Sequence, residues 1–282
     1  MQTITEFLTE ASQILEASDI ADPRREASSL LLAAIEKDKT FLFAHPEYEL
    51  TAAEQKLFRS FVLRRASREP FHYIVGHKEF YGLDFEVTPE VLIPRPETEM
   101  LVRQSIKILR EIENPIFCEI GAGSGCISVS ILCSIEKASA TGLEISEKAI
   151  AIANRNSIKH NVSERLTLKQ SDIFSALTGE KFDLIVSNPP YVPASDVPEL
   201  QPEVRDFEPH LALTGGGEGL SIIERIIIEA PRFLKREGFL LIEIGLGQAE
   251  TVSGLFDMKI WRAVDIVPDF QTIPRMVRAR IN

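Results

Sequence analysis

The first part of the chain has the spacing of apolar positions that is typical of helices. Apolar residues recur at every third or fourth position over residues 4–15, directly after a capping box that begins at Thr3. Asp22-Pro23 is typical of an N-cap followed by proline at the first helical position, and a second capping box begins at Thr51. We therefore expect residues 1–78 to form a small helical domain that recognises a substrate or partner, with simple support of the core as the alternative.

In the rest of the chain, apolar runs of strand length alternate with helical patterns. Such alternation predicts an α/β domain, over residues 101–282, in which helices flank a mostly parallel sheet. Residues 81–87 alternate like a short strand, and we expect residues 79–100 to form a β-hairpin and linker between the two domains. We expect seven strands in the α/β domain, the last of them antiparallel: 116–120, 138–143, 166–170, 182–187, 239–244, 261–267 and 276–281.

The composition is that of an ordinary globular protein with more than one domain. A chain of 282 residues, 44% of them hydrophobic, is long for a single core. No N-terminal leader is visible, and the longest apolar stretches, such as residues 30–35, are too short to cross a bilayer. We expect a cytoplasmic protein with no membrane partner.

The chain is acidic overall but has one basic segment. A net charge of −11 disfavours a large surface that binds the phosphate backbone of a nucleic acid, so we expect no stable nucleic-acid partner. Within residues 51–70 the basic side chains outnumber the acidic ones, which favours the solvated face of a helix; contact with an acidic partner or ribosomal RNA is the alternative. The basic residues are Lys56, Arg59, Arg64, Arg65 and Arg68.

The cysteines and histidines show no metal-ligand pattern. Cys118, Cys126 and Cys133 contain no Cys-x-x-Cys pair, and the five histidines are scattered along the chain. We expect the three thiols to be small core residues of a reducing compartment, and we expect no metal site.

A glycine-rich loop follows the first strand of the α/β domain. Gly121-Ala122-Gly123-Ser124-Gly125 lets the backbone approach a ligand closely before a helix begins. The dinucleotide fingerprint needs another glycine where this chain has Cys126. The spacing therefore favours an adenosyl group without a pyrophosphate, and a simple strand-to-helix turn is the alternative.

Acidic residues end the next two strands. Glu144 lies 19 residues after Gly125, at a distance typical of a carboxylate that accepts both ribose hydroxyls. Asp172 could accept the amino group of adenine while Ile173 packs against the base. A helix N-cap and a core residue are the alternative for this second pair.

The tetrapeptide Asn188-Pro189-Pro190-Tyr191 follows the fourth strand and suits the binding of a planar NH₂ group. The Asn188 side-chain oxygen and the Pro189 carbonyl can each accept one N–H, and the prolines fix the direction of the carbonyls. The Tyr191 ring can cover the flat group. The alternative is a tight turn after a strand.

Together these features suggest a methyl donor placed beside an amino acceptor. The region resembles the Rossmann-like, class I, S-adenosylmethionine-dependent methyltransferases that act on planar nitrogen. Over nearly its full length the chain is similar to the HemK/PrmC family, the release factor glutamine methyltransferases. The similar segments are Glu69–Gly76, Leu92–Glu99, the glycine loop and Asn188–Tyr191. Further along the chain they are Glu203-Val204, Phe207-Glu208-Pro209, Ala212-Leu213, Gly215–Leu220, and Glu243-Ile244-Gly245 with Gln248.

The resemblance implies a substrate, a cofactor and site residues. The substrate would be the glutamine amide in the Gly-Gly-Gln loop of peptide chain release factors, and S-adenosylmethionine would be converted to S-adenosylhomocysteine. Asn188–Tyr191 would be catalytic and would bind the substrate together with Arg95. The cofactor would contact Glu119, Gly121, Ala122, Gly123, Ser124, Gly125, Glu144, Asp172, Ile173 and Asn188.

The chain departs from the family pattern at a few positions. Glu119 and Glu144 stand where aspartate is commoner, one methylene longer with the same chemistry. Glu218 also replaces a usual aspartate, and residues 269–275 differ from the family's usual glycine-containing run. The last of these departures puts contacts from the last hairpin in doubt and leaves the expected reaction unchanged.

Three other functions remain as alternatives. An adenine or cytosine amino methyltransferase would use the same two-donor geometry, but it would need a recognition region and a basic groove. A non-catalytic adaptor that keeps the nucleotide fold would be expected to have lost the glycine loop or the tetrapeptide, and both are intact. An NAD-linked oxidoreductase is disfavoured by Cys126.

Overall fold

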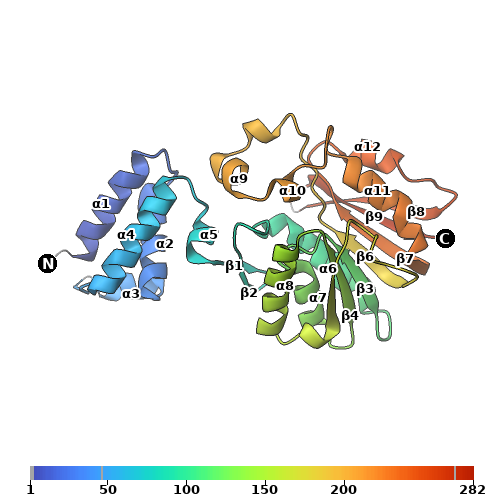
Figure 1. Ribbon diagram of the computed structural model, residues 1–282, viewed down its shortest axis with the longest axis horizontal. Helices are drawn as coiled ribbons and strands as arrows, with labels where there is room; N and C mark the ends of the chain where they lie inside the picture. The colour runs from blue at the N-terminus through green and yellow to red at the C-terminus, as the bar shows by residue number, and fades with distance from the viewer. Residues whose placement is uncertain (1–2, 46, 270) are drawn as a thin grey trace. The chain divides into compact units, whose positions relative to one another are not determined.

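The computed structural model describes residues 3–45, 47–269 and 271–282, and these residues form two compact units (Figure 1). One unit consists of Met1–His77 together with Gln201–Phe207, and the other consists of Lys78–Leu200 and Glu208–Asn282. The segment 201–207 thus belongs with the N-terminal helices, although the sequence pattern assigned it to the domain 101–282. We refer to the two as the helical unit and the sheet unit.

The helical unit is built around three amphipathic helices that share one apolar core. The helices α1 (Ile4–Glu16), α2 (Pro23–Ile35) and α4 (Ala52–Ala66) bury Phe7, Leu30, Leu31 and Phe58 among others. Two short helices, α3 (Lys39–Ala44) and α5 (Phe71–Val75), lie between and after them, and α9 (Pro202–Phe207) completes the unit.

The predicted helix starts are confirmed, with one correction. Both capping boxes are formed, at Thr3 and at Thr51, and α2 begins at Pro23 as expected. Asp22, however, has a left-handed backbone with φ of 50° and its side chain makes no capping bond. The fixed φ of proline defines this helix start without help from the aspartate side chain.

The basic segment in and after α4 is only partly a solvated face, so that expectation was wrong for three of its five cations. Arg64 pairs with Glu69, and Arg65 is buried with its guanidinium bound to Glu26 (2.9 Å) and Glu203 (3.0 Å). Arg68 donates to the same Glu203 at 2.8 Å. Arg65 and Arg68 therefore hold α9 within the helical unit through Glu203, while Lys56 and Arg59 are exposed.

The sheet unit contains a short hairpin and a large twisted sheet. The hairpin pairs β1 (His77–Phe80) with β2 (Leu83–Glu86), as predicted. In the described part of the chain the large sheet has seven strands in the order β5-β4-β3-β6-β7-β9-β8, and β9 runs antiparallel to both of its neighbours, β7 and β8. Their bounds are β3 Ile116–Ile120, β4 Ser139–Glu144, β5 Leu166–Gln170, β6 Phe182–Ser187, β7 Leu234–Glu243, β8 Trp261–Pro268 and β9 Pro274–Ile281.

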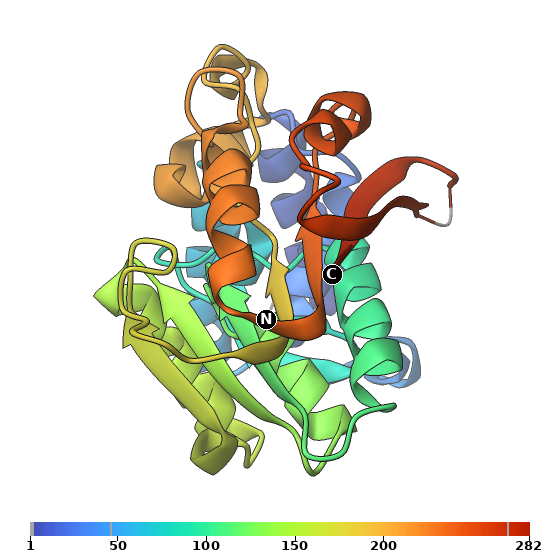
Figure 2. The same ribbon diagram turned by 90° about the vertical axis from the view of Figure 1, so that its right-hand side faces the viewer.

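The predicted strands all occur, and the main difference is the length of β7. This strand begins five residues before the predicted 239, and its pairing with β6 is irregular between Phe182 and Leu184. Lys235, Arg236 and Glu237 interrupt the apolar pattern there, which concealed the start of the strand. Figure 2 shows the antiparallel C-terminal strands, in red, at one side of the sheet.

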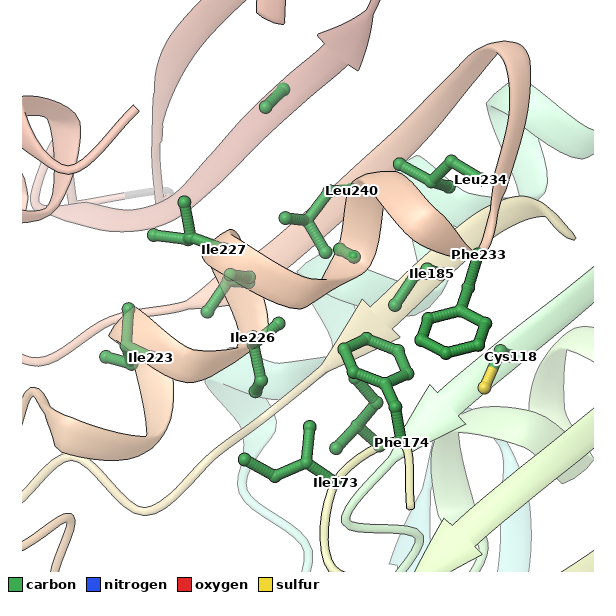
Figure 3. Close-up of a cluster of buried hydrophobic side chains, with 14 of the residues drawn as sticks. Cys118, Ile173, Phe174, Ile185, Ile223, Ile226, Ile227, Phe233, Leu234 and Leu240 are labelled. Carbon is green, nitrogen blue, oxygen red and sulfur yellow. The ribbon is translucent and has the colours of Figure 1, made fainter. Parts of the chain in front are cut away.

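Helices cover both faces of the sheet because its central strands are apolar on both sides. Leu184 and Val186 of β6 pack into a core with α6 (Glu99–Leu109) and α7 (Cys126–Ser134), and α8 (Glu147–Lys159) lies beside α7. Ile185, which points to the other face, packs with α11 (Ser221–Glu229) and α12 (Ala249–Gly254). Figure 3 shows this second core, in which the rings of Phe174 and Phe233 stack with centroids 4.8 Å apart.

The prediction that the three cysteines lie in the core is confirmed for two of them. Cys118 and Cys126 are buried free thiols, whereas Cys133 is exposed near the end of α7, contrary to the prediction. No helix in the described ranges combines the length and the apolar character of a membrane span.

Candidate active site

The carboxyl ends of β3, β4, β5 and β6 surround one cavity of about 350 Å³ in the sheet unit. Such a position, beyond the ends of parallel strands, is where open α/β sheets bind ligands. The structure brings together most of the predicted residues in its wall: Arg95, Glu119, Gly121, Ala122, Gly123, Ser124, Glu144, Asp172, Ile173, Asn188, Pro189 and Pro190. Gly125 and Tyr191 instead pack just behind this wall, as described below.

The glycine loop is tied to β4 and to α8. The N–H groups of Gly121 and Ala122 both donate to the Leu143 carbonyl, which holds the start of the loop against the neighbouring strand. A Cβ atom at Gly125 would lie 3.2 Å from that of Ala153, so this glycine permits close approach of α8. The observed role of Gly125 is therefore helix packing, and its contact with a cofactor stays a prediction.

Two carboxylates at strand ends face the cavity. Glu144 is held at both oxygens, since Oε2 accepts the Gly123 N–H at 2.9 Å and Oε1 accepts the Ser146 N–H at 3.0 Å. Glu119 is buried, and its Oε2 accepts the Ser128 N–H at 3.0 Å while Oε1 has no hydrogen-bond partner among the described residues. Burial raises the pKa of Glu119 to about 8. This buried acceptor is one that a ligand donor group could satisfy.

Asp172 and Ile173 lie at the exit of β5, and the helix N-cap alternative for Asp172 does not hold. The segment after Asp172 is a turn, in which Ser171 Oγ accepts the Ala176 N–H. The Asp172 carboxylate pairs with both terminal nitrogens of Arg225 from α11, each at 3.1 Å. Ile173 both lines the cavity and joins the core shown in Figure 3. No local pattern pointed to Arg225, because it lies 53 positions from Asp172 in the chain.

Asn188 is oriented by a residue that sequence reasoning missed. Its side-chain nitrogen Nδ2 donates to Thr98 Oγ1 at 2.9 Å, and Thr98 is buried and lines the same cavity. With the nitrogen occupied, the Asn188 oxygen is the end that remains to accept a hydrogen bond from a ligand. Ser187, one residue earlier, donates to the Ile120 carbonyl at 2.9 Å and so fixes the end of β6 against β3.

Tyr191 turns away from the cavity wall. Its hydroxyl donates to Glu243 Oε1 at 3.4 Å, and its carbonyl accepts the side-chain amide of Gln248 at 3.0 Å. Burial raises the pKa of the Tyr191 hydroxyl, and the Glu243 carboxylate raises it further. The role of the ring as a cover for a flat substrate group stays a prediction, and the observed role is to anchor the tetrapeptide from behind.

Gly219→Ala is expected to destabilise this anchor. A Cβ atom at Gly219 would lie 2.1 Å from the Tyr191 carbonyl oxygen, which is too close for any real contact. The glycine also has φ of 77°, which other residues adopt only with strain. We expect the free energy of unfolding to fall by about 2 kcal/mol or more, measured by chemical denaturation. Gly217→Ala is the matched control, because nothing lies within 4 Å of its Cβ position; equal stability of the two variants would contradict this role.

Arg95 is fixed at the cavity by a buried partner. Its Nη2 donates to Glu208 Oε1 at 2.6 Å, and the Glu208 side chain is only 1% exposed. Burial raises the pKa of Glu208, and the Arg95 charge opposes that effect. Sequence patterns did not connect these residues, which are 113 positions apart. Arg95 therefore presents a directed cation at the cavity, and its contact with a substrate stays a prediction.

The sheet order, the glycine loop after β3, the carboxylate after β4 and the tetrapeptide after β6 define a Rossmann-like class I methyltransferase. A release factor glutamine methyltransferase from Geobacter sulfurreducens is 41% identical to this chain, over 99% of the chain and 97% of the relative, and one from Koribacter versatilis is 40% identical over 99% and 98%. The chain belongs to the release factor glutamine methyltransferase family.

Two domain models match parts of the chain, and a solved structure shares its fold. Residues 6–76 match the family model described as PrmC N-terminal domain, and residues 100–201 match the methyltransferase small domain. A solved methyltransferase from Pyrococcus furiosus has a TM-score of 0.52 at 16% identity, covering 79% of this chain and 96% of its own. At that identity the likeness supports the fold alone.

The cavity fits the cofactor of such enzymes, S-adenosylmethionine. Glu144, Asp172 and Ile173 all line this cavity, and their predicted contacts, Glu144 with the ribose hydroxyls and Asp172 with Ile173 at the adenine, stay predictions. The unpartnered oxygen of buried Glu119 matches a cationic amino group, which the methionine part of the cofactor carries. Among the described residues, no group of three or more His, Cys, Asp or Glu side chains is arranged to hold a metal ion.

Proposed function

We propose that this protein methylates the side-chain amide nitrogen of the glutamine in the Gly-Gly-Gln loop of peptide chain release factors, using S-adenosylmethionine. The observation that carries the proposal is the orientation of Asn188, whose nitrogen is held by Thr98 so that its oxygen is left to accept an N–H. Family membership, at about 40% identity over the full chain, supports the same substrate.

The chemistry requires that a poor nucleophile be oriented. The lone pair of an amide nitrogen is delocalised into its carbonyl, so methylation is favoured when both N–H bonds are held and the lone pair is aimed at the methyl group. In this proposal Asn188 Oδ1 accepts one N–H and the Pro189 carbonyl accepts the other. The cofactor supplies an electrophilic methyl group on a sulfonium sulfur.

The other residues of the cavity position the two reactants. Glu144 and Glu119 hold the cofactor from the β3 and β4 side, and Pro190 contributes to the wall beside Asn188. Arg95, fixed by Glu208, is a directed donor for a backbone carbonyl of the substrate loop. No general base is needed, because the N-methylated cationic amide is strongly acidic and releases its proton after transfer.

The helical unit has a separate part in this proposal. Its described residues form no catalytic constellation, and its match to the PrmC N-terminal domain supports a role in selecting the release factor. Because the substrate belongs to the translation machinery, we place the reaction in the cytoplasm.

Mass spectrometry of a purified release factor after incubation with the protein and S-adenosylmethionine tests the proposal directly. We expect a gain of one methyl group on the glutamine of the Gly-Gly-Gln tryptic peptide. A parallel incubation with DNA and RNA tests the amino methyltransferase alternative, since an exocyclic NH₂ presents the same two donors. Methylated adenine or cytosine together with an unmodified release factor would overturn the proposal.

A further inference from the structure

The direction of the Pro189 carbonyl matters in the proposed reaction, because this oxygen accepts one N–H of the substrate amide. The rings of Pro189 and Pro190 fix φ at both residues, but they leave the ψ angles free. The carbonyl therefore has a single direction only if the chain is held on both sides of the prolines. On the upstream side β6 holds it, since Ser187 Oγ donates to the Ile120 carbonyl at 2.9 Å.

On the downstream side the chain is held by the side chain of Gln248. Its Nε2 donates to the Tyr191 carbonyl at 3.0 Å, and its Oε1 accepts the Gly245 N–H at 2.8 Å. A backbone N–H can only donate, so it binds the oxygen end of the Gln248 amide and leaves the nitrogen end for the Tyr191 carbonyl. Both hydrogen bonds therefore require the same orientation of this side chain.

The side chain of Gln248 does not serve the helix that it precedes. Gln248 is the N-cap of α12, yet its side chain makes no capping bond to that helix. Its backbone is held separately, because its N–H donates to the Gly245 carbonyl at 3.2 Å and its carbonyl accepts the Val252 N–H at 2.9 Å. A change of the side chain should therefore leave the start of α12 in place.

The segment 243–248 brings this side chain close to the tetrapeptide. A Cβ atom at Gly245 would lie 2.9 Å from Gln248 Oε1 and 3.1 Å from Tyr191 Cδ2, so a larger residue would displace both side chains. At the other end of the segment, Glu243 Oε1 accepts the Tyr191 hydroxyl at 3.4 Å. The segment thus holds Tyr191 at its carbonyl and at its ring.

We propose that Gln248 is a positioning residue for methyl transfer. It fixes the Tyr191 carbonyl, and Ser187 fixes the chain before the prolines, so the Pro189 carbonyl between them keeps one direction, toward the substrate amide. Gln248 acts through the backbone of the tetrapeptide, and no bond is made or broken at it. The proposal deepens the function proposed above and rests on it.

The experiment measures kcat and KM for a purified release factor at saturating S-adenosylmethionine, with the full-length protein. Gln248→Met has a side chain of similar length that makes neither hydrogen bond, whereas Gln248→Glu keeps an acceptor for the Gly245 N–H and loses only the donor to the Tyr191 carbonyl. We expect both variants to lower kcat by about tenfold or more, with KM and cofactor affinity near the wild-type values. Gln271→Glu, at an exposed position between β8 and β9, is the matched control and should keep kcat.

The pH dependence of the variants gives a readout that a merely structural role would not change. When the introduced carboxyl of Gln248→Glu gains a proton, it regains an O–H donor for the Tyr191 carbonyl. Since an acid gains its proton as the pH falls, the kcat of Gln248→Glu divided by that of the wild-type protein should rise between about pH 8 and about pH 5. The same ratio for Gln248→Met should stay constant, because a thioether does not titrate.

Each alternative result is decisive. A normal kcat in either variant at pH 8, or a Gln248→Glu ratio that does not rise at low pH, would overturn the positioning role, as would a loss confined to KM or to cofactor affinity. Methylation of the release factor by the wild-type protein upholds the proposed function in all of these cases. If the wild-type protein binds S-adenosylmethionine but methylates no release factor, both proposals fail. Rates are divided by the number of cofactor sites from calorimetry, which removes unfolded protein from the comparison, and if one variant does not fold the other supplies the answer.

Discussion

Asn188→Ala should slow methyl transfer by a factor on the order of 10² or more while cofactor affinity is largely kept. The alanine removes the oxygen that accepts the substrate N–H, and it removes the nitrogen that Thr98 holds at 2.9 Å. The substrate amide is then no longer oriented during methyl transfer, whereas Glu144 and the glycine loop still bind the cofactor. A single-turnover assay with release factor gives the rate, and calorimetry gives the affinity.

The control for this substitution is Asn154→Ala, the same change at an exposed position on α8. It should leave the single-turnover rate unchanged. A near-normal rate in Asn188→Ala would remove this residue from the mechanism. A large loss of cofactor affinity would instead move Asn188 into the cofactor site.

Glu144→Ala should weaken S-adenosylmethionine binding by about 10- to 100-fold, which corresponds to the loss of charge-assisted hydrogen bonds worth about 1.5–3 kcal/mol. The carboxylate would bind the ribose hydroxyls, and it also accepts N–H groups of Gly123 and Ser146 that fix the loop. With saturating cofactor, much of kcat should return, because the residue has no contact with the reacting amide in the proposed mechanism. Calorimetric titration measures the affinity.

The matched control for charge is Glu147→Ala, which removes an exposed carboxylate three residues away in the first turn of α8. We expect it to change cofactor affinity little, because an exposed charge is screened by solvent. If both variants bind the cofactor equally well, Glu144 does not contact the ribose.

The sequence was sufficient to predict the strand ends that form the cavity, because local patterns carry that information. An apolar run followed by glycines or by the tetrapeptide marks a strand and its exit, and parallel strands place such exits at one edge. The partners from distant segments could not be predicted in this way. Thr98 is 90 positions from Asn188 and Arg225 is 53 from Asp172, and neither lies in a pattern that specifies its partner.

The errors in the sequence analysis have a similar cause. Arg65 was assigned to a solvated helix face because its neighbours in sequence are charged, yet Glu26 and Glu203 allow its burial. Asp172 was given a helix N-cap as the alternative to a ligand contact, whereas its carboxylate pairs with Arg225 of α11. In each case a tertiary contact outweighed the local preference.

The inclusion of α9 in the helical unit bears on how the protein can be divided. The chain passes between the two units at residues 77–78, 200–201 and 207–208, so no single cut separates them. A fragment that ends at residue 77 would lack Glu203, and the guanidinium of Arg65 would lose that acidic partner and keep Glu26. Dissection of this enzyme into autonomous pieces would therefore require α9 to be grafted onto the N-terminal fragment.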